Sequence, residues 1–220
     1  MSEHTIVFLH GFASSAQSTK ALYLRGRFDG QSSVRFCVVN FNPTPADFEY
    51  MTTTGQINRL RQYVLDHELG TVGLIGSSYG GLIALHYAHR FGGVDRMLLL
   101  APGLCWLNGG LSQEELAYWK DRSTVPVHHP AFGRDIPIRY DLQRDGLGYL
   151  AFIPPPAPAL IVHGQNDSTV PLEHSREYAT AYPDTVQLIE VNADHDLNGH
   201  LELIWSLVQS FLLGTGQGGE

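Results

Sequence analysis

Six short apolar runs alternate along the chain with segments of helical spacing, and this alternation constrains the fold more than any other feature. Each run is four to seven residues long, is apolar on both faces and is followed by a loop. The runs cover residues 5–9, 34–40, 72–75, 96–100, 159–163 and 186–191. Strands of this kind, alternating with helices, are typical of a parallel sheet that helices cover on both faces. The sequence therefore predicts an α/β fold with a mostly parallel, six-stranded sheet.

The segments between the runs predict the helices that cover this sheet. They span residues 19–28, 56–67, 79–90, 172–182 and 201–213. A chain of 220 residues can bury one core of this size, so we expect residues 1–213 to form a single domain.

The regular spacing breaks once, over residues 103–152. This segment carries Trp106 and Trp119, several prolines and the acidic start of a helix that we predict at residues 113–120. We expect it to form a lid-like insertion over the carboxyl edge of the sheet. Its two tryptophans would either line a substrate pocket or anchor the insertion to the domain. The polar, glycine-rich residues 214–220 are expected to form a flexible tail.

Composition and charge argue against several classes of protein. Hydrophobic residues make up 43% of the chain and charged residues 16%, and no apolar run reaches the ~18 residues that a membrane span needs. The net charge is −8 and the 14 lysines and arginines are scattered, which disfavours nucleic acid as a partner. The first residues lack the pattern of a signal peptide, and Cys37 and Cys105 have neither zinc nor C-x-x-C spacing. We therefore expect a cytoplasmic protein.

The third apolar run ends at the pentapeptide Gly76-Ser77-Ser78-Tyr79-Gly80, and a predicted helix follows at once. A strand that turns abruptly into a helix exposes the side chain between them, and the turn is too tight for bulk two residues away. Gly76 and Gly80 stand at those two positions around Ser78, whereas Ser77 lacks such flanking glycines. We therefore predict Ser78 as a nucleophile. The alternative is an ordinary strand-to-helix turn with helix-capping serines.

Two side chains suited to acid–base chemistry follow the last two runs. Ligands of an open parallel sheet bind at the carboxyl ends of its strands, and Asp167 and His195 stand just after the fifth and sixth runs. A serine hydroxyl needs an imidazole to remove its proton, and the imidazole needs a carboxylate on its other nitrogen. We predict His195 as the base and Asp167 as the acid.

Other acids and other roles compete with this assignment. Asp194 and Asp196 are chain neighbours of His195, which makes the required hydrogen bond awkward, and Asp95 lies before its strand, at the opposite edge of the sheet. The alternative for Asp167 is a side chain that caps its own loop, and the alternative for His195 is a surface histidine.

The remaining histidines are not assigned to chemistry. His10 and His163 end apolar runs and are interpreted as core histidines. The pair His128-His129 has no third or fourth ligand at zinc spacing, so no metal site is expected.

The negative oxygen that forms during acyl transfer needs backbone donors close to the nucleophile. The N–H of Tyr79, directly after Ser78, and the N–H of Phe12, after the first strand, fit this requirement. Gly11 lets the first loop come close. We predict these two N–H groups as the oxyanion hole.

Four motifs follow the predicted strands, and they carry the predicted nucleophile, acid and base in the chain order Ser, Asp, His. They are His10-Gly11-Phe12, Gly76-Ser77-Ser78-Tyr79-Gly80-Gly81, His163-Gly164-Gln165-Asn166-Asp167 with Val170-Pro171, and Asp194-His195. Over nearly its whole length the chain thereby resembles the α/β-hydrolase superfamily. The resemblance implies that the six strands lie in the order 2-1-3-4-5-6, with the switch point of the sheet between the first and third strands. The opening motif continued by Ala13-Ser14-Ser15, with Ser18 and Lys20, and the Gly-Ser-Ser turn are similar to the small YqiA-type esterases of bacteria. The segment 103–152 departs from the compact YqiA pattern and leaves the substrate open.

The resemblance implies serine esterase chemistry on acyl esters, without a cofactor, and it implies Ser78, Asp167 and His195 as the triad. We therefore expect a carboxylesterase that acts on a small acyl ester. A thioesterase, a lipase-like enzyme or a peptidase would use the same machinery, and a non-catalytic binding protein could keep the same fold. The oligomeric state is left open.

Overall fold

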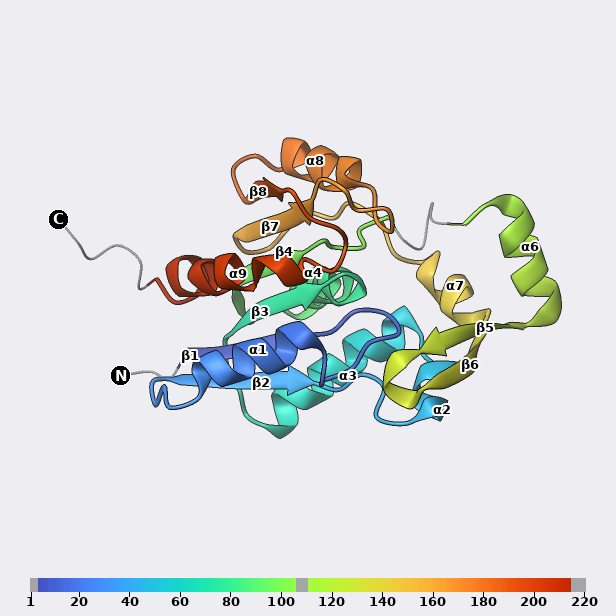
Figure 1. Cartoon of the computed structure of the whole chain (residues 1–220), viewed down its shortest axis with the longest axis horizontal. Helices are drawn as coiled ribbons and strands as arrows, with labels where there is room; N and C mark the ends of the chain where they lie inside the picture. Colours follow the sequence, from blue (N-terminus) through green and yellow to red (C-terminus); the bar gives the residue numbers. More distant parts are fainter. Residues whose placement is uncertain (1–3, 106–110, 215–220) are drawn as a thin grey trace.

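The computed structural model describes residues 4–105 and 111–214, and its main feature is a parallel sheet of six strands (Figure 1). The strands are β1 His4–Leu9, β2 Val34–Val39, β3 Val72–Ser77, β4 Val94–Leu100, β7 Ala159–Gly164 and β8 Val186–Val191. They lie in the order β2-β1-β3-β4-β7-β8, and every neighbouring pair is parallel. The predicted fold class and the predicted strand order are both confirmed.

The strand order reverses beside β1, which pairs with β2 on one side and with β3 on the other. Ile6 is opposite Phe36 of β2 and opposite Gly73 of β3. Because all strands run in the same direction, their carboxyl ends meet at one edge of the sheet. The loops after β1 and β3 start side by side there, at the place where open α/β sheets bind their ligands.

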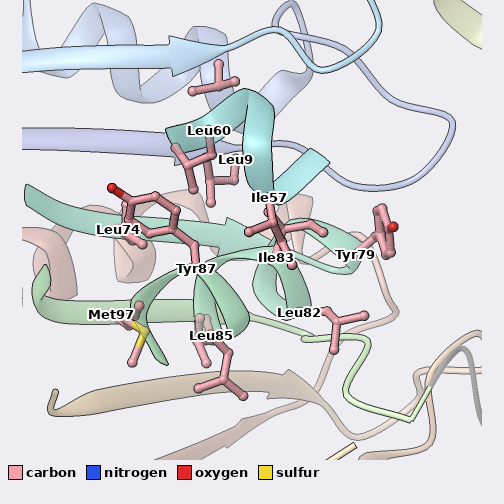
Figure 2. Close-up of a cluster of buried hydrophobic side chains, with 14 of the residues drawn as sticks. Leu9, Ile57, Leu60, Leu74, Tyr79, Leu82, Ile83, Leu85, Tyr87 and Met97 are labelled. Carbon is pink, nitrogen blue, oxygen red and sulfur yellow. The ribbon is translucent and has the colours of Figure 1, made fainter. Parts of the chain in front are cut away.

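Side chains alternate between the two faces of the sheet, so each face has its own core. Val7 and Leu9 belong to one buried cluster, and Ile6 and Phe8 belong to the other. The first face is covered by α3 Thr53–Asp66, α4 Tyr79–Phe91 and α8 Leu172–Ala181; the second is covered by α1 Thr19–Phe28 and α9 Leu201–Leu207. Figure 2 shows part of the first cluster, where side chains of α3 and α4 meet those of β1, β3 and β4.

The helices follow the predicted segments, with local differences at their ends. Helix α3 begins at Thr53 instead of residue 56, because the Thr52 hydroxyl caps it by accepting a hydrogen bond from the Gly55 N–H at 3.0 Å. The segment predicted at 201–213 divides into α9 and a π-helical turn, Val208–Leu212. No helix within residues 4–105 and 111–214 is both long enough and apolar enough to cross a bilayer.

The segment between β4 and β7 has its own small structure (Figure 1). Its elements are α6 Gln113–Arg122, an antiparallel hairpin of β5 Thr124–His129 and β6 Arg134–Arg139, and α7 Asp141–Gly146. The predicted helix at 113–120 is present and extends to Arg122. The hairpin was not predicted, because Pro126 and Pro137 face each other across it and proline, which cannot donate to a strand ladder, is depleted from strands.

Trp119 connects α6 to this hairpin. Its indole N–H donates to the carbonyl oxygen of Ile138 at 2.9 Å, and the side chain is buried. The ring also lines a hollow of about 370 Å³ together with Leu111 and Tyr118. Trp106, which we predicted beside Trp119 as a pocket or anchoring residue, lies outside the described residues.

The segment between β4 and β7 is tied to the start of α3 by hydrogen bonds. The Asp145 carboxylate accepts hydrogen bonds from the Thr54 N–H at 2.8 Å and from the Thr54 hydroxyl at 2.6 Å. The Tyr149 hydroxyl lies 2.6 Å from the same Thr54 oxygen and donates to it, because the Thr54 proton is given to Asp145. The carboxylate thus also lies at the positive end of the helix dipole. In addition, β6 packs against α2 Pro45–Glu49.

Candidate active site

Ser78 occupies a sharp turn between β3 and α4, as the sequence predicts. Its φ angle is +53°, in the left-handed region that non-glycine residues rarely adopt, and such strain costs on the order of 1–3 kcal/mol. A Cβ atom on Gly76 would lie 2.6 Å from the Gly80 carbonyl oxygen, and one on Gly80 would overlap the Leu9 carbonyl oxygen. Only glycine fits at these two positions, and the turn holds the Ser78 side chain out of the sheet.

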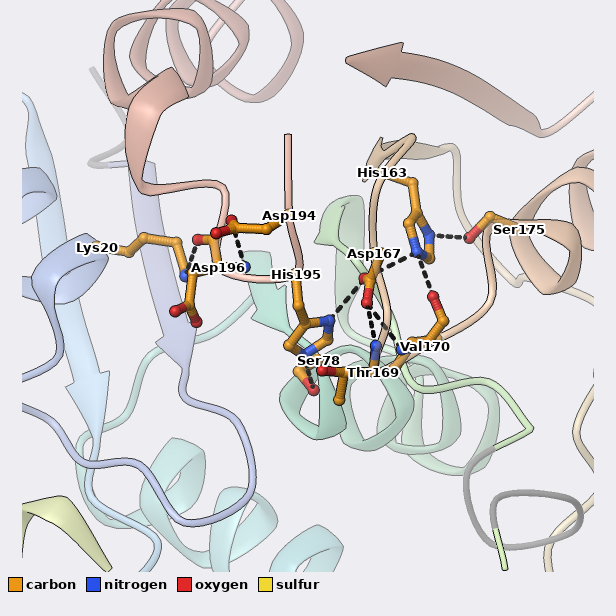
Figure 3. A network of polar contacts seen from close by, with 10 residues as sticks. All are labelled: Lys20, Ser78, His163, Asp167, Thr169, Val170, Ser175, Asp194, His195 and Asp196. Atoms are coloured by element: carbon orange, nitrogen blue, oxygen red, sulfur yellow. Dashed lines mark hydrogen bonds and ion pairs between the residues drawn. The ribbon is translucent and has the colours of Figure 1, made fainter. Parts of the chain in front are cut away.

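The His195 imidazole lies between Ser78 and Asp167 (Figure 3). Its Nε2 atom is 2.9 Å from Ser78 Oγ, and its Nδ1 atom is 2.7 Å from Asp167 Oδ2. An ionised carboxylate only accepts hydrogen bonds, so Nδ1 carries the proton and Nε2 accepts from the Ser78 hydroxyl. The three predicted side chains, which come from loops after β3, β7 and β8, are therefore brought together in one hydrogen-bonded chain.

The Asp167 carboxylate is buried and held by several donors. Its Oδ1 atom accepts from the N–H groups of Thr169 and Val170, both at 2.8 Å. Its Oδ2 atom contacts His195 and also His163, whose Nε2 lies 3.1 Å away. Burial acts to raise the pKa of this carboxyl, but the hydrogen bonds from Val170, His195 and Thr169 outweigh it, so the pKa lies below its ordinary value.

The rival acids have other partners. Asp194 Oδ1 accepts from the N–H of Asp196 at 3.1 Å, which closes a local turn beside His195. Asp95 lies near the start of β4, where its carboxylate accepts from the Arg96 N–H at 2.9 Å. Of the four acids considered, Asp167 is the one that the structure places on the His195 ring.

Two contacts hold the loop that carries His195 after β8. The Asn166 N–H donates to the Ala193 carbonyl oxygen at 2.9 Å, and a Cβ atom on Gly164 would overlap the same oxygen, so the loops after β7 and β8 pack tightly. On the far side, the ammonium group of Lys20 in α1 donates to the Asp196 carbonyl oxygen at 2.6 Å (Figure 3). The sequence singled out Lys20 only as part of a motif and gave it no role.

The loop after β1 passes directly beside Ser78. A Cβ atom on Gly11 would lie 3.2 Å from Ser78 Cβ, so a larger residue there would press on the serine. Phe12, whose N–H is one predicted oxyanion donor, follows Gly11 in this loop, and Tyr79, which carries the other, is the first residue of α4. The backbone of both residues is therefore adjacent to Ser78.

His10 fixes this loop, a role that the interpretation as a core histidine did not include. The ring is buried; its Nε2 accepts from the Phe41 N–H at 3.1 Å, and its Nδ1 lies 3.0 Å from the Gly11 carbonyl oxygen. Burial lowers the pKa of His10 to about 4, so the ring is neutral near pH 7 and its one proton is on Nδ1. The Gly11 carbonyl and the Phe12 N–H belong to the same peptide group, so this contact also sets the direction of that N–H.

The pair His128-His129 is split between two environments. His128 lies on the exposed side of the hairpin, where its Nδ1 is 3.1 Å from Asp135 Oδ1. His129 is buried between Phe48 and Phe132. Within residues 4–105 and 111–214, no group of three or more histidine, cysteine, aspartate or glutamate side chains is placed to hold a metal ion.

Solved structures of α/β hydrolases share this fold at low sequence identity. Mouse alpha/beta hydrolase domain-containing protein 10 has 20% identity and a TM-score of 0.78 over 96% of this chain and 90% of its own. Est1E from Butyrivibrio proteoclasticus with bound ferulic acid has 19% identity and a TM-score of 0.79 over 97% and 90%. The monoacylglycerol lipase of Paleococcus ferrophilus has 15% identity and a TM-score of 0.73 over 98% and 97%.

Comparison with curated protein sequences gives no match. A match to a family is found over residues 5–212, which is nearly the whole chain. This span contains all the loops described above, including those of Ser78, Asp167 and His195. The chain has the α/β-hydrolase fold and belongs to the uncharacterised protein family UPF0227, which is YqiA-like.

Proposed function

We propose that the protein is a serine carboxylesterase. The observation that carries this proposal is the position of the His195 ring, 2.9 Å from the Ser78 hydroxyl and 2.7 Å from the Asp167 carboxylate. Both distances lie within the range that proton transfer and orientation require. The strained turn, the buried acid and the close approach of the Gly11 loop support the same chemistry.

In the proposed reaction, His195 removes the Ser78 proton while Oγ attacks the ester carbonyl carbon. The imidazolium that forms is stabilised by Asp167, and the negative oxygen of the tetrahedral intermediate is bound by the N–H groups of Phe12 and Tyr79. His195 then protonates the leaving alcohol, which leaves an acyl group on Ser78. A water molecule, deprotonated by the same ring, releases the acid and restores the serine.

An ester is the proposed substrate class because two structural neighbours are named for lipid ester hydrolysis, the lipolytic enzymes LipS and LipT and a monoacylglycerol lipase, and Est1E was solved with bound ferulic acid. Another neighbour is named as a non-heme bromoperoxidase, so the fold alone does not select the ester. A thioester or a peptide would react by the same steps, so the distinction depends on the pocket around Ser78 and not on the triad. A panel of p-nitrophenyl esters of graded chain length, with matched thioesters and anilides, separates these substrates. We expect the highest kcat/KM for an ester.

The insertion adjoins this proposed site through aromatic contacts. His129 of β5 packs edge-on against Phe48 of α2, with 4.6 Å between ring centroids, and Phe48 packs against Phe12 at 5.1 Å. We therefore propose that residues 103–152 act as a lid-like part of a single domain over residues 1–213, with Trp106 and Trp119 among its pocket or anchoring residues.

Covalent labelling with a fluorophosphonate tests the proposed nucleophile. We expect one adduct on the peptide that contains Ser78 and none in Ser78→Ala, which should also lose about 10⁴- to 10⁶-fold in kcat because the triad acts as a unit. The neighbouring variant Ser77→Ala is the matched control and should be labelled like the parent. A parent protein that forms no adduct and hydrolyses no ester would instead be a binding protein with a hydrolase fold.

A further inference from the structure

A second histidine, which unlike His195 is fully buried, touches the carboxylate of the candidate site (Figure 3). His163 lies near the end of β7 and is fully buried. Its Nε2 is 3.0 Å from the Val170 carbonyl oxygen and 3.1 Å from Asp167 Oδ2, and its Nδ1 is 2.7 Å from Ser175 Oγ. Ser175 comes from α8 and is also fully buried. Both ring nitrogens therefore have a polar partner.

The partners fix where the proton of the His163 ring resides. The Val170 carbonyl oxygen can only accept a hydrogen bond, so Nε2 must carry the hydrogen. Burial lowers the pKa of His163, which favours a neutral ring with a single proton. Nδ1 is then an acceptor, and the Ser175 hydroxyl donates to it. With the opposite tautomer, the Nε2 lone pair would face two acceptor oxygens.

We propose that Ser175 and His163 form a positioning pair for Asp167, and this inference rests on the proposed esterase function. The two backbone donors hold Oδ1, whereas Oδ2 must face His195. In this proposal the His163 N–H, which donates to the Val170 carbonyl oxygen, is shared with Oδ2 at 3.1 Å and helps to keep the plane of the carboxylate from turning away from the His195 ring. Ser175 acts one step further away, because its hydroxyl donates to Nδ1 and holds the ring in the orientation that aims the Nε2 hydrogen at these acceptors.

Two substitutions at His163 separate donation from packing. Gln places an amide N–H close to the position of His Nε2, whereas Met fills a similar volume without a donor. We expect His163→Met to lower kcat by about 10- to 100-fold with KM within about twofold, as is typical when an outer hydrogen-bond partner of a functional side chain is lost. His163→Gln should recover most of that kcat. His86→Met, which replaces another buried histidine, should retain the parental kcat.

Loss of this donor should also change the pH profile, which altered packing alone would not do. Without the His163 N–H, the negative charge of Asp167 is less dispersed and stabilises the His195 imidazolium more strongly. The acidic limb of kcat/KM should therefore move to higher pH in His163→Met, and in Ser175→Ala to a smaller extent. The proposal would be overturned if His163→Met and His163→Gln had the same kcat and if the acidic limb of the kcat/KM profile stayed at the parental pH in both.

Imidazole ¹⁵N NMR of the full-length parent provides a readout that does not depend on activity. We expect protonated Nε2 and unprotonated Nδ1 for His163, and in Ser175→Ala the same tautomer with a shifted Nδ1 resonance, because that nitrogen has lost its hydrogen-bond donor. A proton on Nδ1 in the parent would overturn the proposed pair even if His163→Met fails to fold. A parent that lacks both ester hydrolysis and fluorophosphonate labelling would overturn the proposed function, whereas the tautomer would still decide the hydrogen bonds of the pair.

Discussion

The Lys20 ammonium group lies 2.6 Å from the carbonyl oxygen of Asp196, so helix α1 holds the loop that carries His195 across 176 positions of sequence. The side chain is buried. Burial lowers the pKa of Lys20, and the carboxylates of Asp196 and Asp194 act in the opposite direction. Because burying a charged group is costly unless it is hydrogen-bonded, the Lys20 ammonium group is held against this carbonyl oxygen. Removing it should release the Asp194–Leu197 part of the loop.

We expect Lys20→Met to lower the free energy of unfolding by about 2 kcal/mol, since a hydrogen bond to a charged group contributes roughly 1.5–3 kcal/mol. The proposed base would also lose its fixed position, so kcat should fall while KM changes little. Urea denaturation and steady-state kinetics measure the two effects. Lys120→Met is the matched control, because Lys120 is exposed on α6. Parental kcat in Lys20→Met would show that other contacts suffice to hold the loop.

A side chain at Gly80 should disrupt the turn at Ser78. The added Cβ would overlap the Leu9 carbonyl oxygen of β1, so either the strand or the helix must move. We expect Gly80→Ala to lower the free energy of unfolding by about 3 kcal/mol or more and to abolish labelling of Ser78. Gly26→Ala in α1 has open space and should raise stability by roughly 0.5–1 kcal/mol. Equal effects in the two variants would contradict the tight packing of the turn.

Stability should fall as the pH is lowered from about 6.5 towards 4. Burial lowers the pKa values of His10 and His86 from 6.5 to about 4. The unfolded chain therefore binds protons at these rings in a pH range where the folded chain does not, and protonation favours unfolding. Each ring contributes up to about 3 kcal/mol to this loss.

Urea denaturation at several pH values measures this effect. The decline should be shallower in His86→Met, because one of the two rings is gone. A free energy of unfolding that stays constant between pH 6.5 and 4 would contradict the burial of both rings as neutral imidazoles.

The contact between Asp145 and Thr54 should control how firmly the insertion is held. Asp145→Ala removes two hydrogen bonds to the start of α3, so we expect faster limited proteolysis within residues 103–152 and a change in KM. Asp141→Ala, which removes the ion pairs with Arg139 and Arg144 near the surface, is the control and should have little effect. Equal proteolysis rates in the two variants would argue against the role of Asp145.

The sequence contains enough local information for the sheet but not for the insertion. The strands that are apolar on both faces predict their own positions, and the strand order followed from the resemblance to α/β hydrolases. The hairpin of β5 and β6 could not be predicted from the sequence, because its strands face solvent on one side and carry Pro126 and Pro137. The three side chains of the candidate site were predicted to meet because each follows a parallel strand, whose carboxyl ends share one edge of the sheet.

The support around those side chains could not be predicted in the same way. His163 was interpreted as a core histidine, and it is buried in the core. Its contact with Asp167 and its tautomer depend on the loop that returns through Val170, and the orientation of its ring depends on Ser175 of the next helix. The contact of Lys20 with Asp196 joins elements that are far apart in sequence. Such hydrogen bonds are set by tertiary packing, and a single sequence carries no periodic signal for them.

Strand β8 is the last strand of the sheet in the sequence, so it is also the last to be synthesised. His195 follows the last strand to be made, 117 residues after Ser78. At translation rates of about 5–20 residues per second, the proposed nucleophile leaves the ribosome on the order of ten seconds before its base. During that interval the nascent chain has the proposed nucleophile without the proposed base. The proposed reaction therefore cannot occur until the final strand has paired with β7.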